Sequence, residues 1–220
     1  NTMSSAFEAL GISLPYSSTM ANVHEEKVQS AKESARVLVQ AIRKSIKPRD
    51  IVTRKSIENA VAVIMATGGS TNAGLHLPAI AHEAGIAFTL DDVAEVFART
   101  PLIADLQPGG RFLAVDLHRV GGTRAVLKAL LDGGHLHGQA LTLSGRTLAE
   151  ELAHTPAPDG QVVRPTTQAI MDSGGVVVLK GNLAPEGALI KVAGLKNLVF
   201  EGPARVFENE EDAYAAVSAR

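Results

Sequence analysis

The stretch MATGGSTNAGLHLPAIAHEAGI, residues 65–86, decides how the first half of the chain folds. Its apolar run ends at a glycine pair, and a second helix-like apolar segment begins only a few residues later. Three polar side chains lie between the two segments: Ser70, Thr71 and Asn72. Because glycine adopts backbone angles that other residues avoid, Gly68 and Gly69 permit a sharp change of direction. The stretch therefore predicts a corner between two helices.

The polar residues of this corner have two interpretations. In the first, Ser70 or Thr71 caps the second helix, because Ser and Thr are preferred at helix starts. In the second, the corner binds a carboxylate or a phosphate, because a helix start presents unpaired N–H groups and partial positive charge. No Gly-Lys-Ser/Thr follows, so the stretch is not a Walker phosphate loop. The residues alone leave both interpretations open.

Further helices are predicted on both sides of the corner. Capping residues, helix-breaking residues and the spacing of apolar residues indicate where they begin and end. Before the corner, helices are predicted at Thr2–Leu10, at Asn22–Lys44 and from Thr53 to the glycine pair. After it, one helix is predicted from Thr71 or Asn72 to Gly85 and another from Thr89 onward, where Asp92 completes a capping box. The long second helix carries apolar residues on one face, which we expect to be buried: Val28, Ala31, Ala35, Leu38, Val39 and Ile42.

After Pro101 the pattern changes. RFLAVDL (111–117) and QALTLSG (139–145) are typical of short buried strands, with a glycine-bounded helix between them. Thr147 and Glu150 form a capping box for another short helix. Residues 175–195 predict a hairpin, KNLVFEG (196–202) a further strand, and the last ten residues a helix. The chain is thus expected to be an α/β protein, with a helix-rich domain over residues 1–165 and the beginning of a β-rich domain over residues 166–220.

Composition excludes several classes of function. The 21 basic and 23 acidic residues nearly balance, which argues against nucleic acid or an anionic membrane as partner. No apolar stretch reaches the ~18 to 20 residues that a membrane span requires. The chain has no cysteine, so it forms no disulfide and cannot by itself hold zinc or an iron–sulfur cluster through thiolates. Because Asn1 stands where an initiator methionine would and the last helix pattern has no cap, we expect a piece of a longer protein.

Two other polar groups are candidate sites. SLPYSSTMAN, residues 13–22, is a hydroxyl cluster in which Thr19 or Asn22 would cap the long helix. Asp116 and His118 would share one face of a strand, where they could bind a metal or act as a base, but a surface ion pair with Arg119 explains the aspartate more simply.

The motifs in this chain resemble those of the dihydroxy-acid dehydratase and phosphogluconate dehydratase family, and most of all the dihydroxy-acid dehydratases. The resemblance is carried by NTMSSAFEALGISLPYSSTMAN (1–22), KPRDIVTRKSIENAVAVIMATGGSTNA (47–73), DLHRVGG (116–122), LKGNLAPEGALIKVAGLKN (179–197) and GPARVFENEEDA (202–213). It corresponds to the middle third of such an enzyme. It implies a helix-rich three-layer α/β domain followed by the start of a smaller, swivelling, barrel-like β domain.

The resemblance also implies a chemistry. Enzymes of this family are hydro-lyases that remove water from a 2,3-dihydroxy acid to give a 2-keto acid, here in the synthesis of branched-chain amino acids. An iron–sulfur cluster (2Fe-2S or 4Fe-4S) acts as Lewis acid on the leaving hydroxyl, Mg²⁺ holds the carboxylate and the 2-hydroxyl, and a serine alkoxide removes the C2 proton. The resemblance further implies a cytoplasmic homodimer with a small dihydroxy acid as its substrate.

Few of these parts match positions in this chain. In the family, a cluster cysteine stands just before the position of Asn1, and the other metal ligands and the basic serine lie further away in the sequence. The resemblance therefore places Asn1 and Thr2 near the cluster and implies that this chain alone holds no metal, has no catalytic residue and is inactive. It favours a substrate-cleft role for five residues: Gly68, Gly69, Ser70, Thr71 and Asn72.

Two alternatives remain open. One is a sugar-acid dehydratase of the same family, acting on phosphogluconate or an aldonate. The other is a binding or assembly module that keeps the fold without a cofactor. A parent sequence with cysteines just before Asn1 would favour the enzyme over the module.

Overall fold

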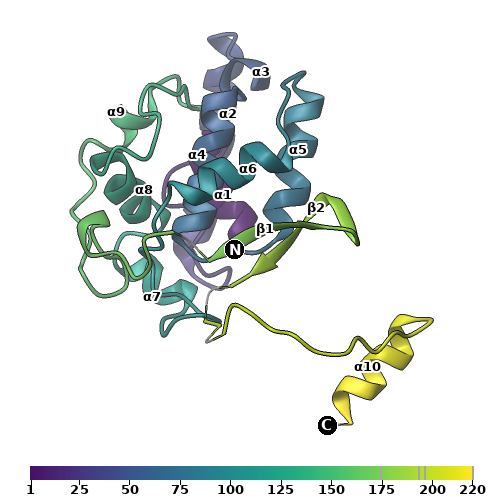
Figure 1. The fold of residues 1–220 in the computed structure, drawn as a ribbon. Coiled ribbons are helices and arrows are strands. Elements are labelled where there is room, and N and C mark those ends of the chain that lie inside the picture. The colour runs from purple at the N-terminus through teal and green to yellow at the C-terminus, as the bar shows by residue number, and fades with distance from the viewer. Residues whose placement is uncertain (174, 193, 196, 220) are drawn as a thin grey trace.

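The computed structural model describes residues 1–173, 175–192, 194–195 and 197–219. The elements are α1 (Thr2–Leu10), α2 (Glu25–Arg43), α3 (Pro48–Ile51), α4 (Arg54–Ala66), α5 (Asn72–Glu83), α6 (Leu90–Ala98), α7 (Ala114–Arg119), α8 (Thr123–Asp132), α9 (Leu148–Leu152), the 3-10 turn η1 (Thr166–Gln168), β1 (Val176–Gly181), β2 (Ala184–Lys191) and α10 (Glu210–Ser218) (Figure 1). The described part of the chain is thus helix-rich, with one two-stranded sheet. No described helix is long and apolar enough to cross a membrane.

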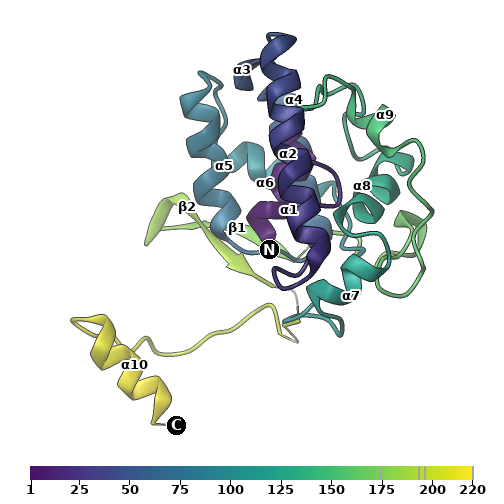
Figure 2. The same ribbon diagram turned by 180° about the vertical axis from the view of Figure 1, so that it is seen from behind.

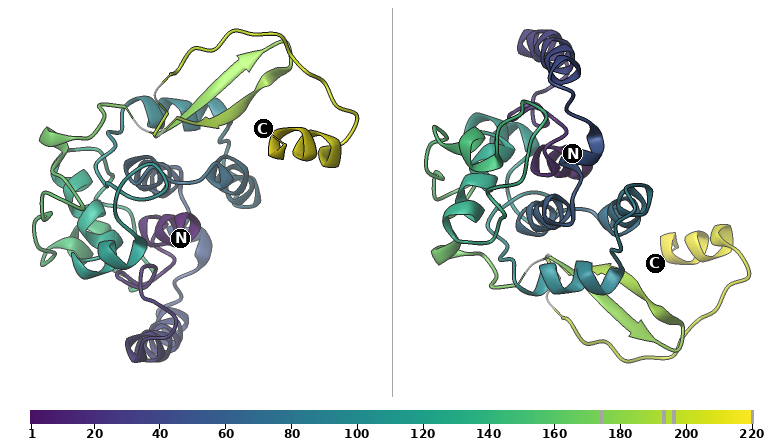
Figure 3. Two further views of the ribbon diagram at one scale, coloured as in Figure 1. Left: turned by 90° about the horizontal axis from the view of Figure 1, so that it is seen from below. Right: turned by 90° about the horizontal axis from the view of Figure 1, so that it is seen from above.

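Helix α4 is the centre of the bundle. It carries the apolar run that precedes the glycine pair, and every residue from Ala60 to Ala66 is buried. A helix that is apolar on all sides is stable only when other elements surround it. Seen along its axis, α4 is surrounded by α1, α5, α6 and α8 (Figure 3). The corner at the end of α4 is therefore held by the fully buried end of a core helix.

The structure explains why glycine occupies both positions 68 and 69. Gly68 has φ +59°, and the N–H groups of Gly68 and Gly69 donate to the carbonyls of Met65 (3.1 Å) and Ile64 (2.9 Å). This is the Schellman pattern that ends many helices. A Cβ on Gly69 would lie 2.9 Å from the methyl groups of Ile64 and Thr2. The first glycine therefore turns the chain, and the second allows α1 to pack closely against the end of α4.

Most helix boundaries that rest on capping chemistry are confirmed. Thr53, Thr89 and Thr147 each accept a hydrogen bond from the backbone N–H three residues later, at the starts of α4, α6 and α9. Helix α1 ends at Gly11, which has φ +89°, and α8 lies between glycines as expected. These features depend on neighbours in the sequence, so they could be predicted locally.

The prediction for the long helix was wrong about its buried face. Helix α2 exists, but its buried residues are Val37 and Ala41. The six apolar residues expected in the core are exposed, with Leu38 at 53% and Ile42 at 67%. Figure 2 shows α2 on the outside of the bundle, in front of α1. Periodicity indicates that a helix has an apolar face, but it does not identify the surface that the helix contacts.

Two predicted strands are absent. Residues 114–119 form α7, because the Asp116 carboxylate accepts the Leu113 N–H at 2.9 Å and so completes a helix start. Residues 139–145 form an irregular loop with a single bridge between Leu141 and Thr147, in which the chain turns back through Gly145 (φ +81°). A short apolar run does not distinguish a strand from a buried turn of helix or loop.

The C-terminal segment agrees with prediction only in part. Strands β1 and β2 form the expected antiparallel hairpin, with Val176 opposite Lys191. The strand predicted at 196–202 is wrong for its described residues 197–202, where Phe200 is 93% exposed; Lys196 lies outside the described residues. A strand requires a neighbour for its hydrogen bonds, and no described strand lies beside this segment. Helix α10 confirms the helix pattern at the end of the chain.

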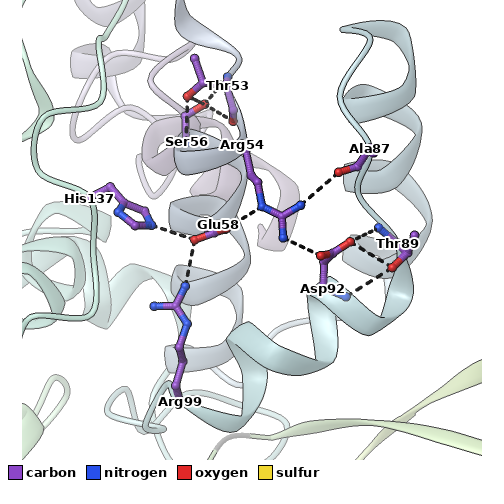
Figure 4. Close-up of polar contacts among 9 residues, drawn as sticks. All are labelled: Thr53, Arg54, Ser56, Glu58, Ala87, Thr89, Asp92, Arg99 and His137. Atoms are coloured by element: carbon purple, nitrogen blue, oxygen red, sulfur yellow. Dashed lines mark hydrogen bonds and ion pairs between the residues drawn. The ribbon is translucent and has the colours of Figure 1, made fainter.

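An ion-pair network fixes the first half of α4 to its surroundings (Figure 4). The Glu58 carboxylate accepts hydrogen bonds from Arg54 Nε (3.1 Å), Arg99 Nη2 (3.0 Å) and His137 Nε2 (2.8 Å). Arg54 also donates to Asp92 on α6, with 2.5 Å between Nη2 and Oδ1. The network joins α4, α6 and the loop after α8, and so supports the helix on which the corner depends.

This network predicts a dependence of stability on pH. The hydrogen bond from Arg54, followed by that from the Thr89 N–H, lowers the pKa of Asp92. A carboxyl group with a lowered pKa in the folded state stabilises the fold above its unfolded pKa, and this stabilisation is lost as the pH falls through the folded value. We therefore expect Asp92→Asn to lower the melting temperature at pH 7, with the difference from wild type shrinking below about pH 4.

Glu95→Gln is the control for this experiment, because Glu95 is an exposed carboxylate on the same helix with no ion pair among the described residues. Thermal melts of the three proteins from pH 7 downward measure the effect. A constant difference between wild type and Asp92→Asn at all pH values would contradict the assignment.

Candidate functional site

A cavity of about 440 Å³ opens beside the corner. Five segments line it: the start of α1, residues 67–71, the loop 106–108, α7 and the end of β2; Thr19 completes the wall. These segments are far apart in the sequence, and the packing of α1 against the end of α4 brings the first two together. The cavity therefore exists only in the folded chain.

The two groups of candidate residues meet in this cavity. The Ser70 N–H donates to Thr2 Oγ1 at 3.1 Å, which connects the residues expected near the cluster with those expected in the substrate cleft. Asn1 also lines the cavity, and its side-chain amide donates to the Ser18 carbonyl at 3.1 Å. Of the five corner residues, Gly68, Gly69, Ser70 and Thr71 line the cavity. Asn72 is exposed and is not part of the wall.

The corner offers fewer free donors than a bare helix start. The N–H groups of both glycines are used by the end of α4, that of Ser70 by Thr2, and that of Asn72 by Ser70 Oγ at 3.3 Å. Within the described part of the chain, the N–H and hydroxyl of Thr71 have no hydrogen-bond partner. The Ser70 hydroxyl therefore supplies the side-chain acceptor at the start of α5, and Thr71, which occupies the N-cap position without a side-chain cap bond, is the residue whose donors are available to a ligand.

Lys191, at the end of β2, is the functional candidate that the sequence reasoning missed. Among the residues that the structure describes, it is the only charged side chain that lines the cavity. Burial lowers its pKa, and no carboxylate of the described residues forms an ion pair with it. The sequence carried one partial signal, because residues two apart on a strand share a face, so Lys191 was bound to lie on the same face as the apolar Leu189. Nothing in the sequence indicated which surface this face of the hairpin would meet.

The hydroxyl cluster at residues 13–22 forms a separate wall. A second cavity of about 490 Å³ lies against it, and Asn1, Thr19 and Ala114 line both cavities. The predicted capping role is wrong, because α2 begins after His24. Instead, the buried Glu8 carboxylate holds the loop by accepting the N–H groups of Tyr16 (2.9 Å) and Ser18 (2.7 Å).

Asp116 and His118 do not act together. Because α7 is a helix, the two side chains point in different directions, and Asp116 pairs with Arg119 at 2.9 Å, as the simpler interpretation predicted. His118 is buried, with Nδ1 3.1 Å from Thr19 Oγ1 and Nε2 2.7 Å from Glu26 Oε1. This histidine fixes the loop that carries Thr19.

The cofactors that the resemblance implies, an iron–sulfur cluster and Mg²⁺, each require particular donor atoms. Thiolates hold iron–sulfur clusters, and carboxylates commonly hold Mg²⁺. The chain has no cysteine, and no three His, Asp or Glu side chains among the described residues converge on a point. The described residues do not fit either group, so no catalytic step is assigned to a metal held by them.

Comparison with known proteins identifies the class. The family model described as dihydroxy-acid/6-phosphogluconate dehydratase N-terminal matches residues 1–151, and the corresponding C-terminal model matches residues 161–220. Together the two models cover nearly the whole chain. The chain belongs to the dihydroxy-acid/6-phosphogluconate dehydratase family.

Similar curated proteins carry the name dihydroxy-acid dehydratase. The protein of Polaromonas sp. (strain JS666) is 62% identical over 222 residues, which is 100% of this chain and 39% of the relative. Dihydroxy-acid dehydratase 2 of Bordetella bronchiseptica is 64% identical over 219 residues, 99% of this chain and 38% of the relative. The protein of Ralstonia nicotianae is 59% identical over 222 residues. The chain thus spans about two fifths of the length of these relatives.

Proposed function

We propose that this chain is part of a dihydroxy-acid dehydratase, a hydro-lyase that converts 2,3-dihydroxy acids to 2-keto acids in branched-chain amino-acid synthesis. One observation carries the proposal beyond the family. The cavity joins Thr2, the Thr71 donors and a lysine, which together suit an anionic, hydroxyl-rich molecule. The names of the relatives support the same substrate class.

The chain's own part in this function is to bind and orient the substrate. Thr71 supplies a hydroxyl and an N–H, and Thr2 and Ser70 hold the corner in place. Fixed donors of this kind raise the rate when they keep the reacting groups in position. We assign the iron–sulfur cluster, the Mg²⁺ and the basic serine of the proposed enzyme to its parts outside this chain, so the isolated chain is expected to be inactive.

In the proposed enzyme, this chain would contribute to two domains. Residues 1–165 would belong to a three-layer α/β domain, and residues 166–220 would begin a swivelling, barrel-like domain that is completed elsewhere in the parent protein. The N-terminal and C-terminal family models support a division in this region. A cytoplasmic homodimer remains part of the proposal.

The nearest alternative is a sugar-acid dehydratase, because the family includes both activities. The complete protein containing this chain should be assayed with 2,3-dihydroxy-3-methylbutanoate and with 6-phosphogluconate. We expect the first to be converted to its keto acid at a kcat/KM at least about tenfold higher. A preference for 6-phosphogluconate would favour the alternative, and no turnover of either substrate would favour a module without catalysis.

A further inference from the structure

We propose that Lys191 binds the carboxylate of the substrate, in addition to the Mg²⁺ that the proposed enzyme would hold outside this chain, and that contact of the hairpin with Gly74 on α5 brings the lysine to the corner. The inference rests on the proposed function, because it assumes that the substrate occupies the cavity beside Thr71. It adds a charged side chain to a wall whose other described side chains are hydroxyl, amide and apolar. A carboxylate binds most strongly where such donors include a charged one.

The hairpin is positioned by a close contact. Side chains two apart on a strand point to the same side, so Leu189 and Lys191 share one face of β2. A Cβ on Gly74 would lie 1.8 Å from Leu189 Cδ1, which shows that Leu189 occupies the space where a side chain on α5 would stand. Gly74 is in the first turn of α5, three residues after Thr71. Leu189 over Gly74 therefore places Lys191 next to the corner.

The second lysine of the hairpin differs in its surroundings. Lys180 on β1 pairs with Asp91, with 2.5 Å between Nζ and Oδ1. Lys191 forms no such pair with a carboxylate of the described residues, and it is more shielded from water than a surface lysine. A partly buried cation gains more from an anion than an exposed one, because the surrounding medium screens the attraction less. Lys180 is thus a matched control on the same hairpin.

The test uses the 220-residue chain and D-glycerate, a 2,3-dihydroxy carboxylate, as probe. Changes in the NMR chemical shifts of the Ser70 and Thr71 backbone amides report binding at the corner. Protection of Lys191 from acetylation by acetic anhydride, measured by mass spectrometry, reports contact of the probe with the lysine. We expect glycerate to produce both effects. Lys191→Met, which keeps the length and removes the charge, should raise the Kd about tenfold, whereas Lys180→Met should change it less than about twofold.

A variant at Gly74 tests the positioning. Gly74→Val should raise the Kd to a similar extent as Lys191→Met, because it displaces Leu189 and moves the end of β2 away from the corner. Thermal melts establish that each variant is folded.

The outcomes separate the two proposals. If glycerate shifts the Ser70 and Thr71 amide signals but its Kd is unchanged in Lys191→Met, the role of the lysine is overturned and the proposed site stays intact. An unchanged Kd in Gly74→Val would overturn the positioning by Leu189. Protection of Lys191 without corner shifts would place the carboxylate at the lysine but away from Thr71, and would overturn both the proposed corner site and the inference that rests on it. The absence of both effects would do the same.

Discussion

Thr71→Val in the complete enzyme is expected to lower kcat/KM by roughly ten- to a hundredfold while leaving the melting temperature almost unchanged. Valine keeps the shape of threonine and removes the hydroxyl. That hydroxyl caps no helix, and it has no partner among the described residues, so the folded protein loses little when it is removed. The substrate, by contrast, would lose a hydrogen bond to a charged group.

Ser70→Ala is the matched control for this prediction. Ser70 Oγ accepts the Asn72 N–H at 3.3 Å, so its loss should cost about 0.5–1 kcal/mol of stability. Its effect on kcat/KM should be smaller than that of Thr71→Val. Steady-state kinetics and thermal melts of both variants are the measurements. If Thr71→Val kept full activity and melted several degrees lower, the corner would be a structural cap and not a binding site.

Glu8→Ala is expected to lower the free energy of unfolding by about 2–3 kcal/mol, the largest effect on stability that we predict for a polar residue. Glu8 is 3% exposed, and both of its carboxylate oxygens accept backbone N–H groups of the loop that carries Thr19. Removing the carboxylate leaves two partly buried donors without a partner. Because this loop borders both cavities, Glu8→Ala should also weaken substrate binding. Urea denaturation measures the first effect.

The pH dependence of Glu8 has the opposite sign to that of Asp92. Burial, the largest influence, raises the pKa of Glu8 above its usual value of 4.5. The folded state then binds the proton more tightly than the unfolded chain, so stability contributed by this group falls as the pH rises from the unfolded pKa through the raised one. Glu8→Gln cannot ionise and should lack this component. The same pH dependence in wild type and Glu8→Gln would show that Glu8 is not the group responsible.

In the C-terminal segment, the hairpin could be predicted from the sequence, but the strand expected after it could not. Two apolar runs around a Gly/Asn/Pro turn predicted β1 and β2, and the structure confirms the pair. The same reasoning predicted a strand at residues 196–202, which is absent from its described part. A hairpin brings its own partner strand, whereas a single strand depends on a neighbour that local sequence does not reveal.

The sequence by itself determined the features that depend on neighbouring residues. The threonine caps at 53, 89 and 147, the end of α1 at Gly11 and the corner after α4 all follow from side chains and glycines within a few positions. The family motifs likewise lie in continuous stretches. Such features form wherever the local backbone is free to adopt them.

Only the tertiary structure decided which surfaces meet. It left the apolar face of α2 exposed, made residues 114–119 a helix, and placed Lys191 beside Thr71 although they are far apart in the sequence. Each outcome depends on the shape of a partner surface, such as the bare backbone at Gly74 under Leu189. Burial and close contact are properties of two surfaces together, and one segment of sequence describes only one of them.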